Sequence, residues 1–73
     1  MKITKGQHLH VDHERKGKFL GIATRDFDTE NEEFYPIASA QGEPIEDRAV
    51  GYEWLKGEEV PCRKSLCSIS LCQ

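Results

Sequence analysis

Apolar residues recur with a period of two in short runs along this chain, and this alternation restricts the fold more than any other feature. In the run Gln7–Asp12, Leu9 and Val11 alternate with polar side chains, as expected for a strand with one buried face. Turn-forming residues end each run after a few positions. No apolar stripe with helical spacing extends over a useful length. The chain is therefore expected to be all-β, or mainly β.

The alternation defines a series of strands separated by turns and loops. The stretch Glu14–Gly17 predicts a tight hairpin turn, because its glycine can adopt a positive φ. Gly21 inside the following strand predicts a bulge, and Pro36 restricts its own strand to an edge. The segments Arg25–Glu33 and Ser39–Asp47 are expected to be loops. The expected strands are Gln7–Asp12, Lys18–Thr24, Glu33–Ala38, Arg48–Trp54, Glu59–Cys62 and Leu66–Cys72.

The number and spacing of these strands predict one small β-barrel domain over residues 1–73. An SH3-like barrel of about five or six strands fits the pattern best. An OB-like barrel is the second choice, because that fold normally inserts a helix where this chain has turn-forming residues. The pattern Gly6-x2-Leu9-x-Val11, followed by Lys16-Gly17-x3-Gly21-Ile22, is similar to the paired strands of KOW and Tudor-like barrels. The resemblance implies architecture only, because a fold does not carry a function.

Composition limits the classes of function. The formal net charge of −3 argues against broad, sequence-independent DNA binding, which usually requires a basic surface. No stretch approaches the ~20 apolar residues that a membrane span requires. Lys2 and Lys5 are not followed by the apolar core of a secretory signal. We therefore expect a cytoplasmic protein without membrane contact, either a monomer or a weak oligomer.

The cysteines lie close together near the C-terminal end, at Cys62, Cys67 and Cys72. An odd, clustered set differs from the even, distributed set of small secreted proteins. On a straight strand, Cys62 and Cys72 would lie about 33 Å apart, far beyond the roughly 7 Å between Cα atoms that a disulfide permits. Alternation would place Cys67 on the opposite face from both. Reduced thiols are expected, with Cys67 in the core and Cys72 at a frayed end.

The run His8-Leu9-His10-Val11-Asp12-His13 resembles the H-x-H-x-D-H signature of metallo-β-lactamase-fold hydrolases. The resemblance would make His8, His10, Asp12 and His13 ligands of zinc ions that activate water. Those enzymes need a much longer α/β scaffold, with further ligands from distant loops. On a strand, moreover, His13 points away from His8 and His10. We therefore expect no metal, no cofactor and no catalytic activity.

The remaining candidates for function are basic and aromatic side chains. Basic residues gather on the expected hairpin and before the last strand, where they could contact phosphates. Trp54 is expected in the core, because the chain has few large residues, and Tyr35 is the aromatic residue expected at the surface. The candidate binding residues are Arg15, Lys16, Lys18, Tyr35, Arg63 and Lys64.

Two functions follow from these observations. The first is a noncatalytic binding or accessory module that acts through an unidentified protein partner. The alternative is a weak RNA- or DNA-binding barrel that uses the basic hairpin and the basic residues before the last strand.

Overall fold

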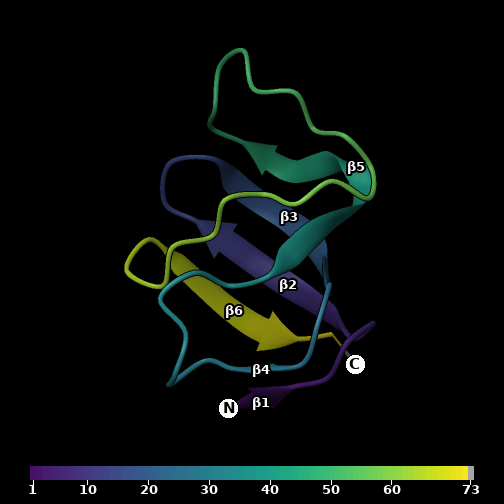
Figure 1. Ribbon diagram of the computed structural model, residues 1–73. Coiled ribbons are helices and arrows are strands. Elements are labelled where there is room, and N and C mark those ends of the chain that lie inside the picture. The colour runs from purple at the N-terminus through teal and green to yellow at the C-terminus, as the bar shows by residue number, and fades with distance from the viewer. Residues whose placement is uncertain (73) are drawn as a thin grey trace.

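The computed structural model describes residues 1–72, and all regular secondary structure within them consists of β-strands (Figure 1). Neighbouring strands pair antiparallel in a sheet with the order β5-β3-β2-β6 and in a separate β1-β4 pair. The prediction of a mainly β fold is confirmed. The strands are β1 (Lys2–Ile3), β2 (His8–His13), β3 (Gly17–Ala23), β4 (Phe27–Asp28), β5 (Ile37–Asp47) and β6 (Cys67–Leu71).

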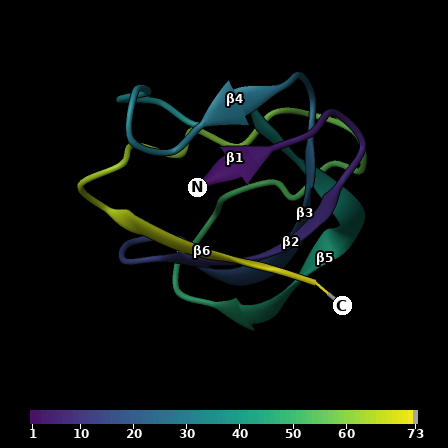
Figure 2. The same ribbon diagram turned by 90° about the horizontal axis from the view of Figure 1, so that it is seen from below.

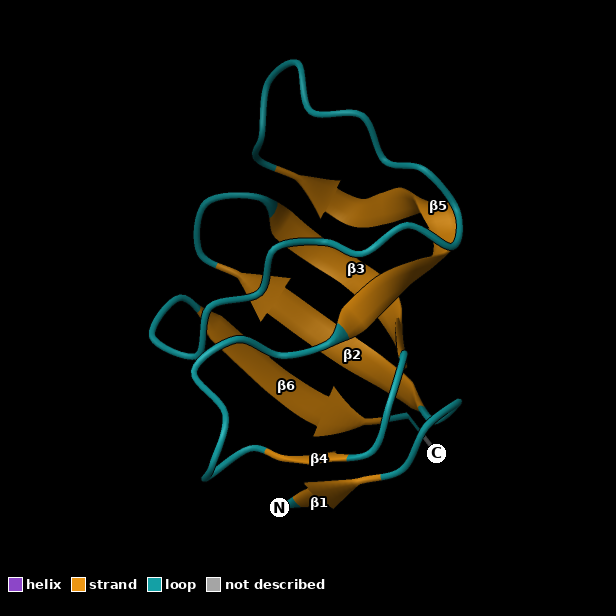
Figure 3. Cartoon of the chain, viewed as in Figure 1, coloured by secondary structure: helices purple, strands orange, loops and turns teal. Residues whose placement is uncertain are grey.

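Neither sheet closes on itself over residues 1–72, so the SH3-like barrel is not confirmed. The β1-β4 pair lies to one side of the larger sheet, and loops connect the two (Figures 2 and 3). Closure would require both edge strands, β5 and β6, to pair, either with each other or through β1 and β4. Each of these short strands has only two residues, and they pair with each other. The described residues form no helix that could span a membrane.

The core follows directly from the alternation in β2 and β3. Leu9 and Val11 of β2 and Phe19 of β3 are almost fully buried on the same face of the larger sheet. Side chains from both sheets and from the long loops complete the cluster. Its buried members are Ile3, Leu9, Val11, Phe19, Ala23, Phe27, Tyr35, Ile37, Val60, Cys62 and Cys67.

The β2–β3 hairpin forms where the sequence predicts it. The turn occupies residues 14–16, and Gly17, which pairs with His13, has a φ of 114°. The pairing is irregular near Gly21, where a bulge or bend was expected, because the β3–β5 register shifts between Phe19 and Gly21, but the extra residues lie on β5 and not on β3. A β-carbon at Gly21 would lie 2.5 Å from Cγ2 of Ile37, so the two strands can approach closely only because this residue is glycine.

The prediction for the segment after Ile37 is wrong in two places. Residues 39–47, expected to be a loop, form most of β5, whereas residues 48–54, expected to be a strand, contain none. Ser39 explains part of β5, because its backbone pairs with Glu58 and Gly57 and its Oγ accepts a hydrogen bond from the Gly42 amide. Glu58 and Gly57 are distant from Ser39 in the sequence, and the bond from Gly42 is made to a buried hydroxyl. Local alternation of apolar and polar residues reveals neither interaction.

Other boundaries differ less. The segment Leu66–Cys72 forms β6 as expected, although β6 is shorter by one residue at each end. The short strand β4 lies within the stretch Arg25–Glu33 that was expected to be a loop. The expected strand Glu59–Cys62 is reduced to an isolated bridge between Glu59 and Ala38.

Candidate functional site

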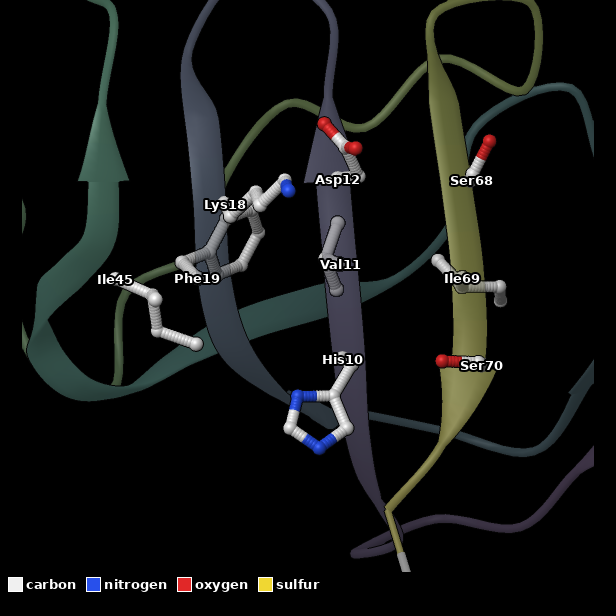
Figure 4. A pocket seen from close by; sticks show the side chains of 9 residues that line it. All are labelled: His10, Val11, Asp12, Lys18, Phe19, Ile45, Ser68, Ile69 and Ser70. Atoms are coloured by element: carbon white, nitrogen blue, oxygen red, sulfur yellow. The ribbon is translucent and has the colours of Figure 1, made fainter.

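A hollow on the solvent-facing side of the larger sheet is the best candidate site, with a volume of about 210 Å³. In Figure 4, Ile45 of β5 stands on one side and the β6 residues stand on the other. His10 lies at one end of the hollow, while Asp12 and Lys18 lie together at the other (Figure 4). The exposed lining side chains are those of His10, Asp12, Lys18, Ile45, Ser68 and Ser70.

Strand alternation and register position these side chains. Because Leu9, Val11 and His13 face inward, His10 and Asp12 must face solvent. Ser70 lies opposite His10 and Ser68 opposite Asp12 on β6, while Lys18 lies opposite Asp12 on β3. Ile45 is 63% exposed and adds apolar surface beside the polar side chains of the hollow.

Charged groups of both signs surround one end of the hollow. The Arg48 guanidinium lies 3.2 Å from Asp12 Oδ1 and 3.2 Å from Glu46 Oε1. Lys18 Nζ lies 3.9 Å from Glu46 Oε2. These pairs are exposed, so each contributes little to stability. A binding partner would therefore meet both positive and negative groups at this end of the hollow, and not a surface with a single sign of charge.

The hollow contains serine, histidine and carboxylate side chains, but they do not form a catalytic chain. Nε2 of His10 contacts Sγ of Cys72 at 3.2 Å, and Asp12 pairs with Arg48. Among the described residues, no hydrogen bond joins a hollow serine to His10. A nucleophilic serine requires such contact with its base.

The candidate residues predicted from the sequence contact different kinds of neighbour. Lys16 Nζ lies 4.3 Å from the centre of the Tyr52 ring, Lys18 pairs with Glu46, and Arg63 lies over the Phe34 ring at 5.2 Å. Lys64 lies near acidic groups, since it shares a hollow with Asp12 and Glu14 as well as with Arg48. Arg15 is exposed on the hairpin turn. Of the six candidates, only Lys18 lines the hollow on the larger sheet.

The expectation that Tyr35 is exposed is wrong. Its side chain is 8% exposed and belongs to the core, with its ring centroid 5.5 Å from that of Phe27. Burial raises the pKa of its hydroxyl. The aromatic ring that reaches solvent is the neighbouring Phe34, which is 56% exposed and contacts Arg63. Because adjacent residues of an extended chain point to opposite sides, only one of Phe34 and Tyr35 can face the core. The contact with Phe27 places Tyr35 there.

His13, the last residue of the histidine-rich motif, is a structural residue of the hairpin. Its ring is buried, and Nδ1 accepts hydrogen bonds of 3.1 Å from the amides of Arg15 and Lys16. The ring also makes a hydrogen bond to the backbone of Pro61. Burial, together with the charge of Lys16, lowers the pKa of His13 below its ordinary value of 6.5. Within residues 1–72, no group of three His, Cys, Asp or Glu residues could hold a metal ion.

The environment of His13 predicts a pH-dependent stability. An unfolded chain binds the proton at about pH 6.5, whereas the folded chain binds it only at lower pH, so stability is complete above pH 6.5 and falls as the pH decreases. Urea unfolding of the wild type and of His13→Gln, measured between about pH 7.5 and 5.0, tests this, because most carboxylates stay ionised in that range. The slope should be smaller in His13→Gln and unchanged in His8→Gln, whose ring is exposed. Equal slopes in all three proteins would contradict the structural role of His13.

The cysteines are free thiols, but their arrangement differs from the predicted alternation. The turn between Arg63 and Leu66 reverses the chain, so Cys62 and Cys67 lie together in the core and share a hydrogen bond. That hydrogen bond and burial raise the pKa of the Cys62 thiol. The expectation that Cys67 points away from Cys62 is therefore wrong, because it assumed a straight strand. The contact between Cys72 and His10 was also missed, since only the β2–β6 pairing brings these residues together.

The fold and site define a small all-β domain with an open sheet and a shallow hollow of mixed polarity. Comparisons with models of known protein families, with curated proteins and with solved structures found no match.

Proposed function

We propose that this chain is a noncatalytic protein-binding module and that the hollow on the larger sheet receives a side chain of the partner. The size and lining of the hollow carry the proposal. Its volume of about 210 Å³ is below the ~300–1,000 Å³ of typical small-molecule pockets. The exposed apolar surface of Ile45 and the mixed charges around Asp12 resemble the apolar centre and polar rim of a protein interface.

The charge distribution supports a protein partner over a nucleic acid. Phosphate binding benefits from several cations that act together. Here Lys18 and Arg48 are paired with carboxylates, and Lys16 and Arg63 lie over aromatic rings. Nucleic-acid binding remains the second proposal, and weak, strongly salt-dependent affinity for RNA or DNA would favour it.

Two finer assignments belong to this proposal. We regard the chain as an SH3-like module with its sheets left open, because the β2–β3 hairpin and the irregular, bent pairing of β5 with β3 have the form expected of such small folds. We also place it in the cytoplasm, because the odd, clustered set of cysteines differs from the even, distributed set of small secreted proteins.

Ile45→Glu should weaken partner binding about tenfold or more without altering the fold. The side chain is exposed, so glutamate costs little folding energy, but a charge at the apolar centre of an interface opposes binding. Val50→Glu is the matched control, because Val50 is a fully exposed apolar residue on a loop outside the hollow. Partners captured from the source cells by the wild type should be retained by Val50→Glu and lost by Ile45→Glu.

The affinities are then measured with the purified partner by calorimetry. Equal affinities of the wild type and Ile45→Glu would contradict the hollow as the binding site. Capture of nucleic acid alone, unaffected by Ile45→Glu, would favour the second proposal.

A further inference from the structure

The strand β6 forms one edge of the larger sheet, and the direction of its backbone groups follows from two hydrogen bonds. The amide of Glu14 donates to the Leu66 carbonyl at 2.8 Å, and the amide of Cys72 donates to the His8 carbonyl at 3.0 Å. In an antiparallel pair, alternate residues turn their N–H and C=O groups toward the partner. Since the even-numbered residues face β2, Cys67, Ile69 and Leu71 direct these groups away from the sheet.

These outward groups are free in the described part of the chain. The pairing of β6 is with β2 alone, and the N–H and C=O groups of the three residues have no hydrogen-bond partner in residues 1–72. Figure 2 views the molecule from below, with β6 running across the picture, and shows β1 and β4 set to one side of β6. The edge therefore offers a row of donors and acceptors that another strand can pair with.

The opposite edge of the same sheet is protected. The first part of β5 is covered by residues 57–60, whose backbones bond to Ile37 and Ser39. The second part contains Pro44 and two glutamates, and its pairing with β3 is irregular. Proline, charge and irregularity are the usual means by which proteins prevent edge pairing. The sequence of β6, Cys-Ser-Ile-Ser-Leu, has none of them, and its pairing with β2 is regular.

We propose that β6 pairs with β6 of a second copy of this chain, antiparallel and centred on Ile69. This register places Ile69 opposite Ile69 and Cys67 opposite Leu71, so every outward-directed residue meets another outward-directed residue. Each such pair exchanges both of its N–H···O bonds. The two larger sheets then become one continuous sheet. This inference concerns a backbone edge and is independent of the partner proposed for the hollow.

The side chains of β6 explain why a second copy fits this edge. On the solvent face, Ser68 lies opposite Ser70 of the other copy, and hydroxyl pairs of this kind stabilise adjacent strands. On the inner face, half-buried Ile69 meets itself, and Leu71, which is 38% exposed, gains an apolar neighbour. The strand has no charged residue, so self-pairing places no like charges opposite each other in β6.

Charge substitution at the exposed serines tests the register. In Ser68→Lys/Ser70→Lys, lysines would face lysines across the new strand pair, and dimerisation should weaken about tenfold. Ser68→Glu/Ser70→Glu should behave alike, whereas a mixture of the two variants should form heterodimers about as tightly as the wild type. The matched control Ser68→Thr/Ser70→Thr should still dimerise. Sedimentation equilibrium of the purified proteins up to millimolar concentration measures each constant, and circular dichroism verifies the folds.

Two further measurements separate this edge from the hollow, which Ser68 and Ser70 also line. Ile45→Glu alters the hollow but not the edge, so it should dimerise like the wild type. Hydrogen exchange followed by NMR should show concentration-dependent protection at the amides of Cys67, Ile69 and Leu71. A wild type that stays monomeric at millimolar concentration, protection confined to other strands, or a mixture that fails to restore pairing would each overturn the proposal.

Discussion

Gly17→Ala is expected to destabilise the fold by about 3 kcal/mol or more, although it adds a single methyl group. The φ of 114° at Gly17 is a conformation that L residues rarely adopt, and such strain costs about 1–3 kcal/mol. The added β-carbon would also collide with the backbone carbonyl of Glu46 and lie 3.0 Å from the Arg48 amide. Relief of this collision requires the end of β5 to move away from β3.

That movement would remove neighbouring interactions as well. The Arg48 amide donates to the Lys16 carbonyl at 3.0 Å, and Gly17 pairs with Asp47 at the end of the β3–β5 ladder. For 73 residues, the total free energy of unfolding is expected to be about 4–11 kcal/mol, so the loss is a large part of it. Urea denaturation of the purified variant measures this loss.

Gly51→Ala is the matched control for Gly17→Ala. Gly51 also has a positive φ, of 83°, but a β-carbon there would have no atom within 4 Å. Gly51→Ala should therefore lose only the free energy of backbone strain, about 1–2 kcal/mol, because it causes no collision with β5. If Gly17→Ala is no more destabilising than Gly51→Ala, close packing of β5 against Gly17 is not important for stability.

The β2–β3 hairpin could be predicted from the sequence because its determinants are local. Alternation identifies the faces of β2, and the glycine after the turn allows the positive φ that starts β3. The strand β5 could not be predicted in this way, since Ser39 pairs with Glu58 and Gly57, which are distant in sequence. The expected strand at residues 48–54 shows the opposite error, because alternation alone is also compatible with a loop.

The candidate site was only partly visible in the sequence. The histidine-rich motif drew attention to β2, which contributes His10 and Asp12 to the hollow, but it suggested metal chemistry instead of a binding surface. Lys18 was identified for its charge and does line the hollow. Ile45 could not be found, because it lies in a segment that was expected to be a loop and its position depends on the irregular pairing of β5 with β3.

Trp54 was expected in the core, and the structure places it as a half-buried residue packed against the core. Its ring centroid lies 5.1 Å from that of Phe19 and 5.0 Å from that of Tyr52. It therefore links the loop after β5 to the largest fully buried side chain of the sheet. Its indole Nε1 is buried and has no hydrogen-bond partner among the described residues.

Trp54→Ala should lower the free energy of unfolding by about 3 kcal/mol, through lost apolar burial, a cavity and the loss of the aromatic pairs. Trp54→Phe should stay within about 1 kcal/mol of the wild type, because it keeps a ring against Phe19 and removes a buried N–H whose missing hydrogen bond costs about 1–3 kcal/mol. Val50→Ala, at a fully exposed apolar position of the same loop, should have almost no effect. Denaturation curves of the three variants give these differences. A loss below about 1 kcal/mol for Trp54→Ala would mean that the indole is a surface group and, with Tyr52, a candidate binding residue in its own right.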